Sequence, residues 1–169
     1  NMTGVFFDAI SFNQPLNNWD VSNVSNTTGM FYRATDFNQS LDNWSTSNVT
    51  EMAYMFFGAT DFNGGIQAWD VSQVVDMTAM FNVAISFNQP LSSWNMSNAV
   101  STNSMFYGAT SFNQPLSSWN TSNVTDMSFM FEGATNFNQP LNTWDVSSVI
   151  GMRHMFASAS SFNQPLDSW

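Results

Sequence analysis

Seven tryptophans recur along the chain at a constant interval of 25 residues, without a single insertion or deletion. They are Trp19, Trp44, Trp69, Trp94, Trp119, Trp144 and Trp169. A strict period of this length is typical of a solenoid, in which each unit buries its apolar side only against its neighbours. The period therefore predicts one repeat solenoid domain of about seven 25-residue coils, spanning residues 1–169.

Other residue types repeat in the same phase, so identical side chains should stack from coil to coil. Phenylalanine forms two such columns, Phe6 to Phe156 and Phe12 to Phe162, which would account for an aromatic content of 16%. An asparagine column runs from Asn13 to Asn163, and its amides can donate and accept along the column or to a turn. A serine column that begins at Ser22 is expected to cap turns in a similar way.

Within one unit the apolar residues lie three or four positions apart, too irregularly for one long helix and too widely for a strand. The stretch Thr125–Gly133 begins with an N-cap residue and ends at a glycine, which predicts one or two turns of α- or 3₁₀-helix. Residues other than glycine close this stretch in four coils, so a glycine cap is not obligatory. We place a short parallel strand at each Ser-Phe-Asn-Gln segment; the competing placement is the Val-Thr-Asp-Met segment.

The composition excludes several classes of protein. Two basic residues stand against twelve acidic ones, giving a net charge of −10, although only 8% of the residues are charged. A nucleic-acid-binding surface needs basic residues, and Arg33 and Arg153 are the only ones, so we expect no nucleic-acid partner. No apolar run is long enough to insert this segment into a membrane. The absence of cysteine excludes disulfides and thiolate metal sites.

The repeat resembles that of a known family. The units SNVTDMSFMFEGATNFNQPLNTW and ATSFNQPLSSWNTSNVTDM closely resemble the 25-residue repeat of BspA-type leucine-rich-repeat surface proteins, and they are similar to that of mycoplasma-type surface lipoproteins. The likeness covers all 169 residues. It implies a leucine-rich-repeat-like right-handed coil with short parallel β-strands and short α or 3₁₀ turns. It also implies an extracellular or cell-surface location, a role in adhesion and no catalytic residues. Gly64 and Gly65 replace Gln-Pro in the third unit, which predicts a looser coil there.

Nothing in the repeat predicts catalysis, a cofactor or a metal site. Catalysis needs different groups that converge, whereas a near-perfect repeat supplies the same groups in parallel columns. His154 is the only histidine and has no counterpart in the other units. Two pairs of acids, Glu51 with Asp76 and Asp36 with Asp61, fall in adjacent coils. Weak binding of a divalent cation at either pair stays open, and a solvated acidic face is the favoured interpretation.

Two variable columns could carry partner recognition, because they tolerate Gly, Glu, Asn and His and should therefore face solvent. Exposed aromatic residues in a row can mark a binding patch. The candidate partner-binding patch consists of Phe7, Tyr32, Tyr54, Phe57 and Tyr107. The alternative is that these rings lie over the coil and only pack it.

The sequence thus favours a non-enzymatic, extracellular or cell-surface protein that is structural or adhesive and contacts proteins or glycans. Both ends of the sequence lie inside the repeat, so we expect an excerpt of a longer array, or a unit that stacks end to end into filaments. Nine Asn-x-Ser/Thr triplets are potential glycan acceptors in a eukaryotic secretory context. The alternative function is binding to ice or another crystal surface. The column from Val21 to Val146 is too mixed in residue type for this role, and the column from Ile10 to Ser160 fits better, although isoleucine interrupts it twice.

Overall fold

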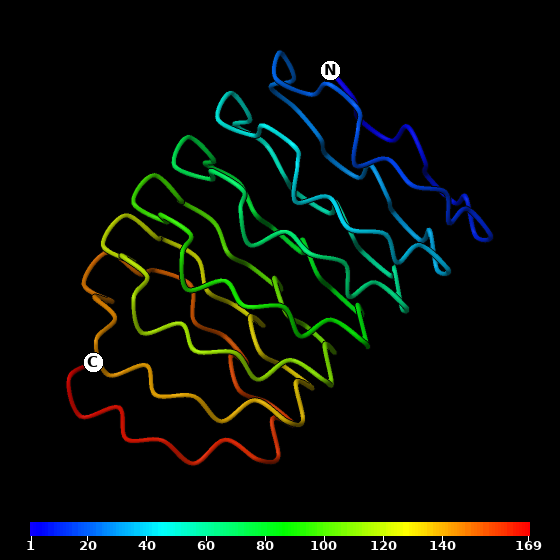
Figure 1. Cartoon of the computed structure of the whole chain (residues 1–169). Helices are drawn as coiled ribbons and strands as arrows, with labels where there is room; N and C mark the ends of the chain where they lie inside the picture. Colours follow the sequence, from blue (N-terminus) through cyan, green and yellow to red (C-terminus); the bar gives the residue numbers. More distant parts are fainter.

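The computed structural model covers residues 1–169 and shows a solenoid. Figure 1 shows the coils stacked in chain order, from the N-terminal coil in blue to the C-terminal coil in red. A single hydrophobic core of 42 buried residues extends from Leu16 to Met155. The coils consist of tight turns joined by irregular segments, with no regular helix and no extended strand. The predicted short helices and short strands therefore do not form.

The backbone N–H groups of each coil alternate between two kinds of partner. Phe31 donates to the carbonyl of Met55 in the next coil at 2.8 Å, whereas the following residue, Tyr32, donates within its own coil to Gly29 at 3.0 Å. The same alternation runs from Gly29 to Ala34 and recurs in the other coils. Because every second N–H is used between coils, the i→i−4 bonds of an α-helix cannot form. The result is a chain of β-turns joined sideways to its copies.

The coils also pair through single parallel bridges, and these fall in the Val-Thr-Asp-Met segment. They link Asn26, Glu51, Asp76, Ser101, Asp126 and Gly151, each to the next. The competing placement of the strand pairing is therefore right, and the placement at Ser-Phe-Asn-Gln is wrong. The physical reason lies in Asn38, whose N–H donates to the Asn13 side-chain oxygen at 3.0 Å and not to a backbone carbonyl.

This side-chain ladder continues along the whole solenoid. Asn113 shows its pattern: its amide oxygen accepts from the N–H of Asn138 at 3.0 Å and from the side-chain amide of Gln139 at 3.0 Å. The last step joins Asn163 to Asn138 at 2.9 Å. Each asparagine thus bonds the turn backbone of the next coil, one of the two roles expected for this column.

Aromatic rings fill the interior in parallel stacks. Phe31 lies 5.4 Å from Phe56 in the next coil, with the two rings 2° from parallel, and 4.1 Å from Phe37 in its own coil. Trp44 stacks on Trp69 at 6.1 Å, and its indole N–H donates to the Leu16 carbonyl of the preceding coil at 2.8 Å. The five tryptophans from Trp44 to Trp144 therefore fill the core and close a buried hydrogen bond, whereas Trp19 is 41% exposed.

Two positions in each coil have a left-handed backbone. One column starts at Gly4 and the other at Asp8, and all seven members of both have φ between 52° and 70°. Only Gly and, less often, Asn or Asp adopt this region readily, yet Val83 adopts it at 55°. The glycines that suggested a helix cap therefore mark a turn conformation that every coil requires, with or without glycine.

The glycine pair in the third coil is tightly packed, and the prediction of a looser coil there is wrong. A Cβ atom on Gly64 would collide with the backbone carbonyl of Gln39 in the coil before it. A Cβ atom on Gly65 would collide with the carboxylate of Asp42. The two glycines let the neighbouring coil approach closely at this point.

We predict that Val83→Gly raises the free energy of unfolding by about 0.5–1 kcal/mol. A left-handed β-branched residue costs about 1–2 kcal/mol, and the entropy lost by glycine on folding offsets part of that gain. Urea unfolding monitored by tryptophan fluorescence measures the change. Val75→Gly is the matched control, because Val75 has an ordinary φ, and this variant should be less stable than the parent. Equal losses in both variants would contradict the strain argument.

We further predict that Asn113→Ala lowers the free energy of unfolding by about 1–3 kcal/mol, because the N–H of Asn138 loses its acceptor and the side chain of Gln139 keeps only its bond to the Asn113 carbonyl. Asn142→Ala is the control, because the Asn142 side chain is exposed and forms no hydrogen bond within the chain; it should change stability by less than about 0.5 kcal/mol. Denaturation midpoints of the two variants give the comparison, and similar midpoints would show that the ladder adds no stability.

Candidate functional site

Four of the five predicted patch residues lie together on one side of the solenoid. Phe7, Tyr32 and Phe57 stack in successive coils, with ring centres 4.5 Å and 4.6 Å apart and ring planes within 3° of parallel. Tyr54 approaches Phe57 at 6.2 Å with a tilt of 51°. Tyr107 contacts none of these rings, because Asn82 occupies its column between Phe57 and Tyr107. The patch is therefore formed by the first three coils alone.

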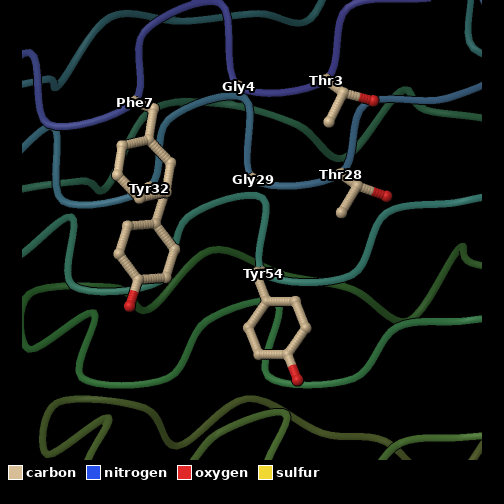
Figure 2. A pocket seen from close by; sticks show the side chains of 7 residues that line it. All are labelled: Thr3, Gly4, Phe7, Thr28, Gly29, Tyr32 and Tyr54. Atoms are coloured by element: carbon tan, nitrogen blue, oxygen red, sulfur yellow. The ribbon is translucent and has the colours of Figure 1, made fainter.

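Beside this stack lies an open groove of about 350 Å³. Figure 2 shows Phe7 and Tyr32 along one side of it, two threonines on the opposite side, and Tyr54 beyond Gly29. Its lining consists of Thr3, Gly4, Phe7, Thr28, Gly29, Tyr32 and Tyr54. We call these seven residues the aromatic groove.

The groove exists because two successive coils lack a side chain at the same position. Gly4 and Gly29 form its floor, with φ of 63° and 58°. In the third coil the same column carries Tyr54, which fills the space and ends the groove. Our sequence reasoning missed the two glycines and the two threonines as lining residues. The available signal was the pair of glycines that open a column otherwise occupied by side chains.

The rings of the groove, and the adjoining ring of Phe57, pack against the coil and remain accessible to solvent. Phe7 is 55% exposed and Tyr54 is 40% exposed, whereas Tyr32 and Phe57 are half-buried. Carbon atoms in contact lie about 3.5–4.0 Å apart. Parallel rings with centres at 4.5 Å are therefore displaced sideways, so that part of each ring face stays uncovered. The rings therefore pack against the coil and, at the same time, leave apolar surface exposed to a partner.

Both cations of the chain are already engaged. Arg33 pairs with Asp8 of the preceding coil, in the same column, at 3.2 Å. Arg153 places its guanidinium carbon 5.5 Å from the centre of the Phe129 ring. His154 lies 3.6 Å from the carboxylate of Glu132. It belongs to the last coil, whereas the groove is formed by the first three coils.

The acidic pairs at Glu51–Asp76 and Asp36–Asp61 do not gain a third ligand. No group of three or more His, Asp or Glu residues is arranged to hold a metal ion. Glu51 and Asp76 are joined by a parallel bridge, which places their backbones side by side.

Another set of acids caps turns. Ser22 donates its N–H to the carboxylate of Asp20 at 3.0 Å, and Ser72 bonds Asp70 in the same way at 2.9 Å. In these turns the serine donates the hydrogen bond, and the capping acceptor is the aspartate two residues earlier. Hydrogen bonds from the serine side chain and then its backbone hold the pKa of Asp20, Asp70 and Asp145 below the usual value. For Asp126, burial raises the pKa, but hydrogen bonds from Asn103 and Ser128 outweigh it and leave the pKa lowered.

One of the two columns considered for ice binding lies in the interior. This column, which is also too mixed in residue type, cannot meet a crystal surface, because five of its members are buried: Val21, Thr46, Val71, Met96 and Thr121. The column from Ile10 to Ser160 lies at the surface, where Ile10 and Ile85 are exposed and the four threonines are half-buried.

The geometry defines a repeat protein with a solenoid fold and a groove on one side. The family described as "Mycoplasma protein of unknown function, DUF285" matches the chain over residues 1–63, 39–120 and 101–169. The chain belongs to this family, whose matches together cover it from end to end. No curated protein and no solved structure shows significant similarity to it. A helix of the length and hydropathy needed to cross a bilayer is absent.

We predict that replacing Asp20, Asp70 and Asp145 by Asn together reduces the loss of stability in acid. A carboxyl with a lowered folded pKa adds stability above its unfolded value of 3.8, and this stability disappears as the pH falls through the folded value. Asn95 and Asn120 already cap the same turn in other coils. The variant should match the parent near pH 7 and lose less stability between about pH 5 and pH 3. Urea midpoints across this range test it, and parallel curves would contradict it.

Proposed function

We propose that this chain is a non-enzymatic, extracellular or cell-surface repeat protein that contacts a protein or glycan partner through the aromatic groove. The observation that carries the proposal is the groove itself. Two glycines in register open it beside rings that remain partly exposed. Partly exposed aromatic rings around a concavity are typical of binding sites, since they offer a large apolar area with little side-chain entropy to lose.

Membership of the family supports a surface repeat protein. The finer assignment, a right-handed leucine-rich-repeat-like coil related to BspA-type surface proteins with a role in adhesion, is part of the same proposal. It is supported by the in-phase V-T-D-M, G-A-T and F-N-Q-P-L elements of the repeat. A rigid stack of coils suits adhesion because it holds a side groove at a fixed orientation without a conformational cost on binding.

The side chains around the groove support a binding role over catalysis. They are aromatic rings and threonine hydroxyls, with glycine backbone as the floor. General acid–base chemistry depends on a group that titrates near the working pH and reaches the substrate. The one histidine lies in the last coil beside Glu132, whereas the groove is formed by the first three coils.

We predict that the double variant Tyr32→Ala, Phe57→Ala binds the partner at least about tenfold more weakly, because aromatic anchors dominate the energy of small interfaces. Peptide and glycan arrays identify a ligand of the parent protein, and titration calorimetry then compares the variants. Tyr107→Ala is the matched control, since Tyr107 belongs to the same column outside the groove, and it should bind like the parent. Unchanged binding by the double variant would rule the groove out.

A further inference from the structure

We infer that the aromatic groove receives the positively charged side chain of an arginine or lysine from a basic segment of a partner protein. This inference rests on the proposed function and specifies the chemistry of its ligand. Three independent features of the structure lead to it: the charge around the groove, the placement of a cation elsewhere in the same columns, and the arrangement of the rings.

The charge on the threonine side of the groove is negative and uncompensated. On the side of the rings, Asp8 and Arg33 directly follow Phe7 and Tyr32 and balance each other as an ion pair. On the threonine side, Glu51 bridges both to Asn26, whose side chain accepts from the N–H of Thr28, and to Asp76. Neither Glu51 nor Asp76 forms an ion pair, because Arg33 is taken by Asp8 and Arg153 lies over Phe129. A partner that approaches this side meets acids whose charge only its own cations can balance.

The chain itself places a cation against an aromatic ring in the two columns that form the groove. Arg153 belongs to the column of Thr3 and Thr28, and Phe129 belongs to the column of Tyr54. Their separation of 5.5 Å lies within the range of about 6 Å for a cation–π contact. In the last two coils the protein's own guanidinium therefore lies over a ring of these columns. In the third and fourth coils Thr78 stands in place of Arg153, so no guanidinium of the chain lies over the equivalent ring, Tyr54.

The rings and hydroxyls of the groove suit a small cation better than a sugar. A sugar ring stacks on a broad, open aromatic face, but Phe7, Tyr32 and Phe57 cover part of one another's faces. A guanidinium or ammonium group needs only a limited ring area. The hydroxyl of Thr28 forms no hydrogen bond within the chain and can accept one from the ligand. Figure 2 shows this threonine across the groove from Tyr32.

The test uses two blocked pentapeptides, acetyl-Gly-Arg-Gly-Arg-Gly-amide and the same peptide with citrulline in place of arginine. Citrulline keeps the shape of the side chain and removes its charge. We expect the arginine peptide to shift the backbone amide signals of Gly4 and Gly29 in nuclear magnetic resonance titrations at low salt. The citrulline peptide should bind at least about fivefold more weakly.

Gly29→Phe separates binding in the groove from general attraction to an acidic protein. It fills the groove without changing the net charge, and Phe129 shows that the column accepts phenylalanine at a φ of 61°. This variant should lose the response to the arginine peptide, and Tyr54→Leu should weaken it about threefold to tenfold. Tyr107→Ala should respond like the parent, and circular dichroism and urea unfolding confirm that each variant is folded. A Gly29→Phe variant that binds the peptide as tightly as the parent overturns the inference.

The outcomes distinguish the inference from the proposed function. If the citrulline peptide or a neutral array ligand binds as tightly as the arginine peptide and Gly29→Phe abolishes both, the groove is a binding site and the inference about charge is wrong. If tetramethylammonium chloride shifts Gly4 and Gly29 but the arginine peptide does not, a basic protein segment is the wrong ligand. If neither the peptides nor any array ligand responds to Gly29→Phe, both the inference and the proposed function fail.

Discussion

The hydrogen bond between an N–H of one coil and a carbonyl about 24 residues further on governs the whole structure. Phe31 bonded to Met55 is one example, and the same bond recurs at alternate residues of the turn-rich segment. It fixes the register between coils, so every side chain lies above its own copy. The parallel phenylalanine and tryptophan stacks follow from this register, as does the asparagine ladder on the opposite segment. The register also makes repeated charge unfavourable, which explains why charged residues are only 8% of an acidic chain.

The same bond determines the backbone of each turn. Alternating partners force two left-handed residues in every coil, and the chain keeps them even at Val83 and Tyr54. Bonding between coils thus outweighs the local preference of individual residues, since each strained position is held by bonds on both sides. Where the column does contain glycine, as at Gly4 and Gly29, the missing side chains open the aromatic groove. Glycine at these two positions therefore suits the left-handed turn and also shapes the surface.

The groove shows how a repeat protein can carry one local site. A perfect repeat would present seven identical surfaces, whereas Tyr54 closes the groove at one end and Arg153 covers the equivalent ring near the other end of the chain. Glu51 bridges to Asn26, whose side chain accepts from the N–H of Thr28 in the groove lining. Recognition can thus depend on the few columns in which the copies differ, while the constant columns hold the scaffold.

The sequence by itself determined the solenoid, its period and the columns that stack, because side chains in strict register must meet their own copies. It also identified three residues of the groove, Phe7, Tyr32 and Tyr54, together with the adjoining Phe57, but it did not distinguish them from Tyr107. Only the tertiary structure decided where the strand-like pairing lies, because Asn13 captures the N–H that would otherwise pair at Phe-Asn-Gln. It alone revealed the glycine floor and the threonine wall. These depend on which neighbours face a missing side chain, and that is a property of three coils together.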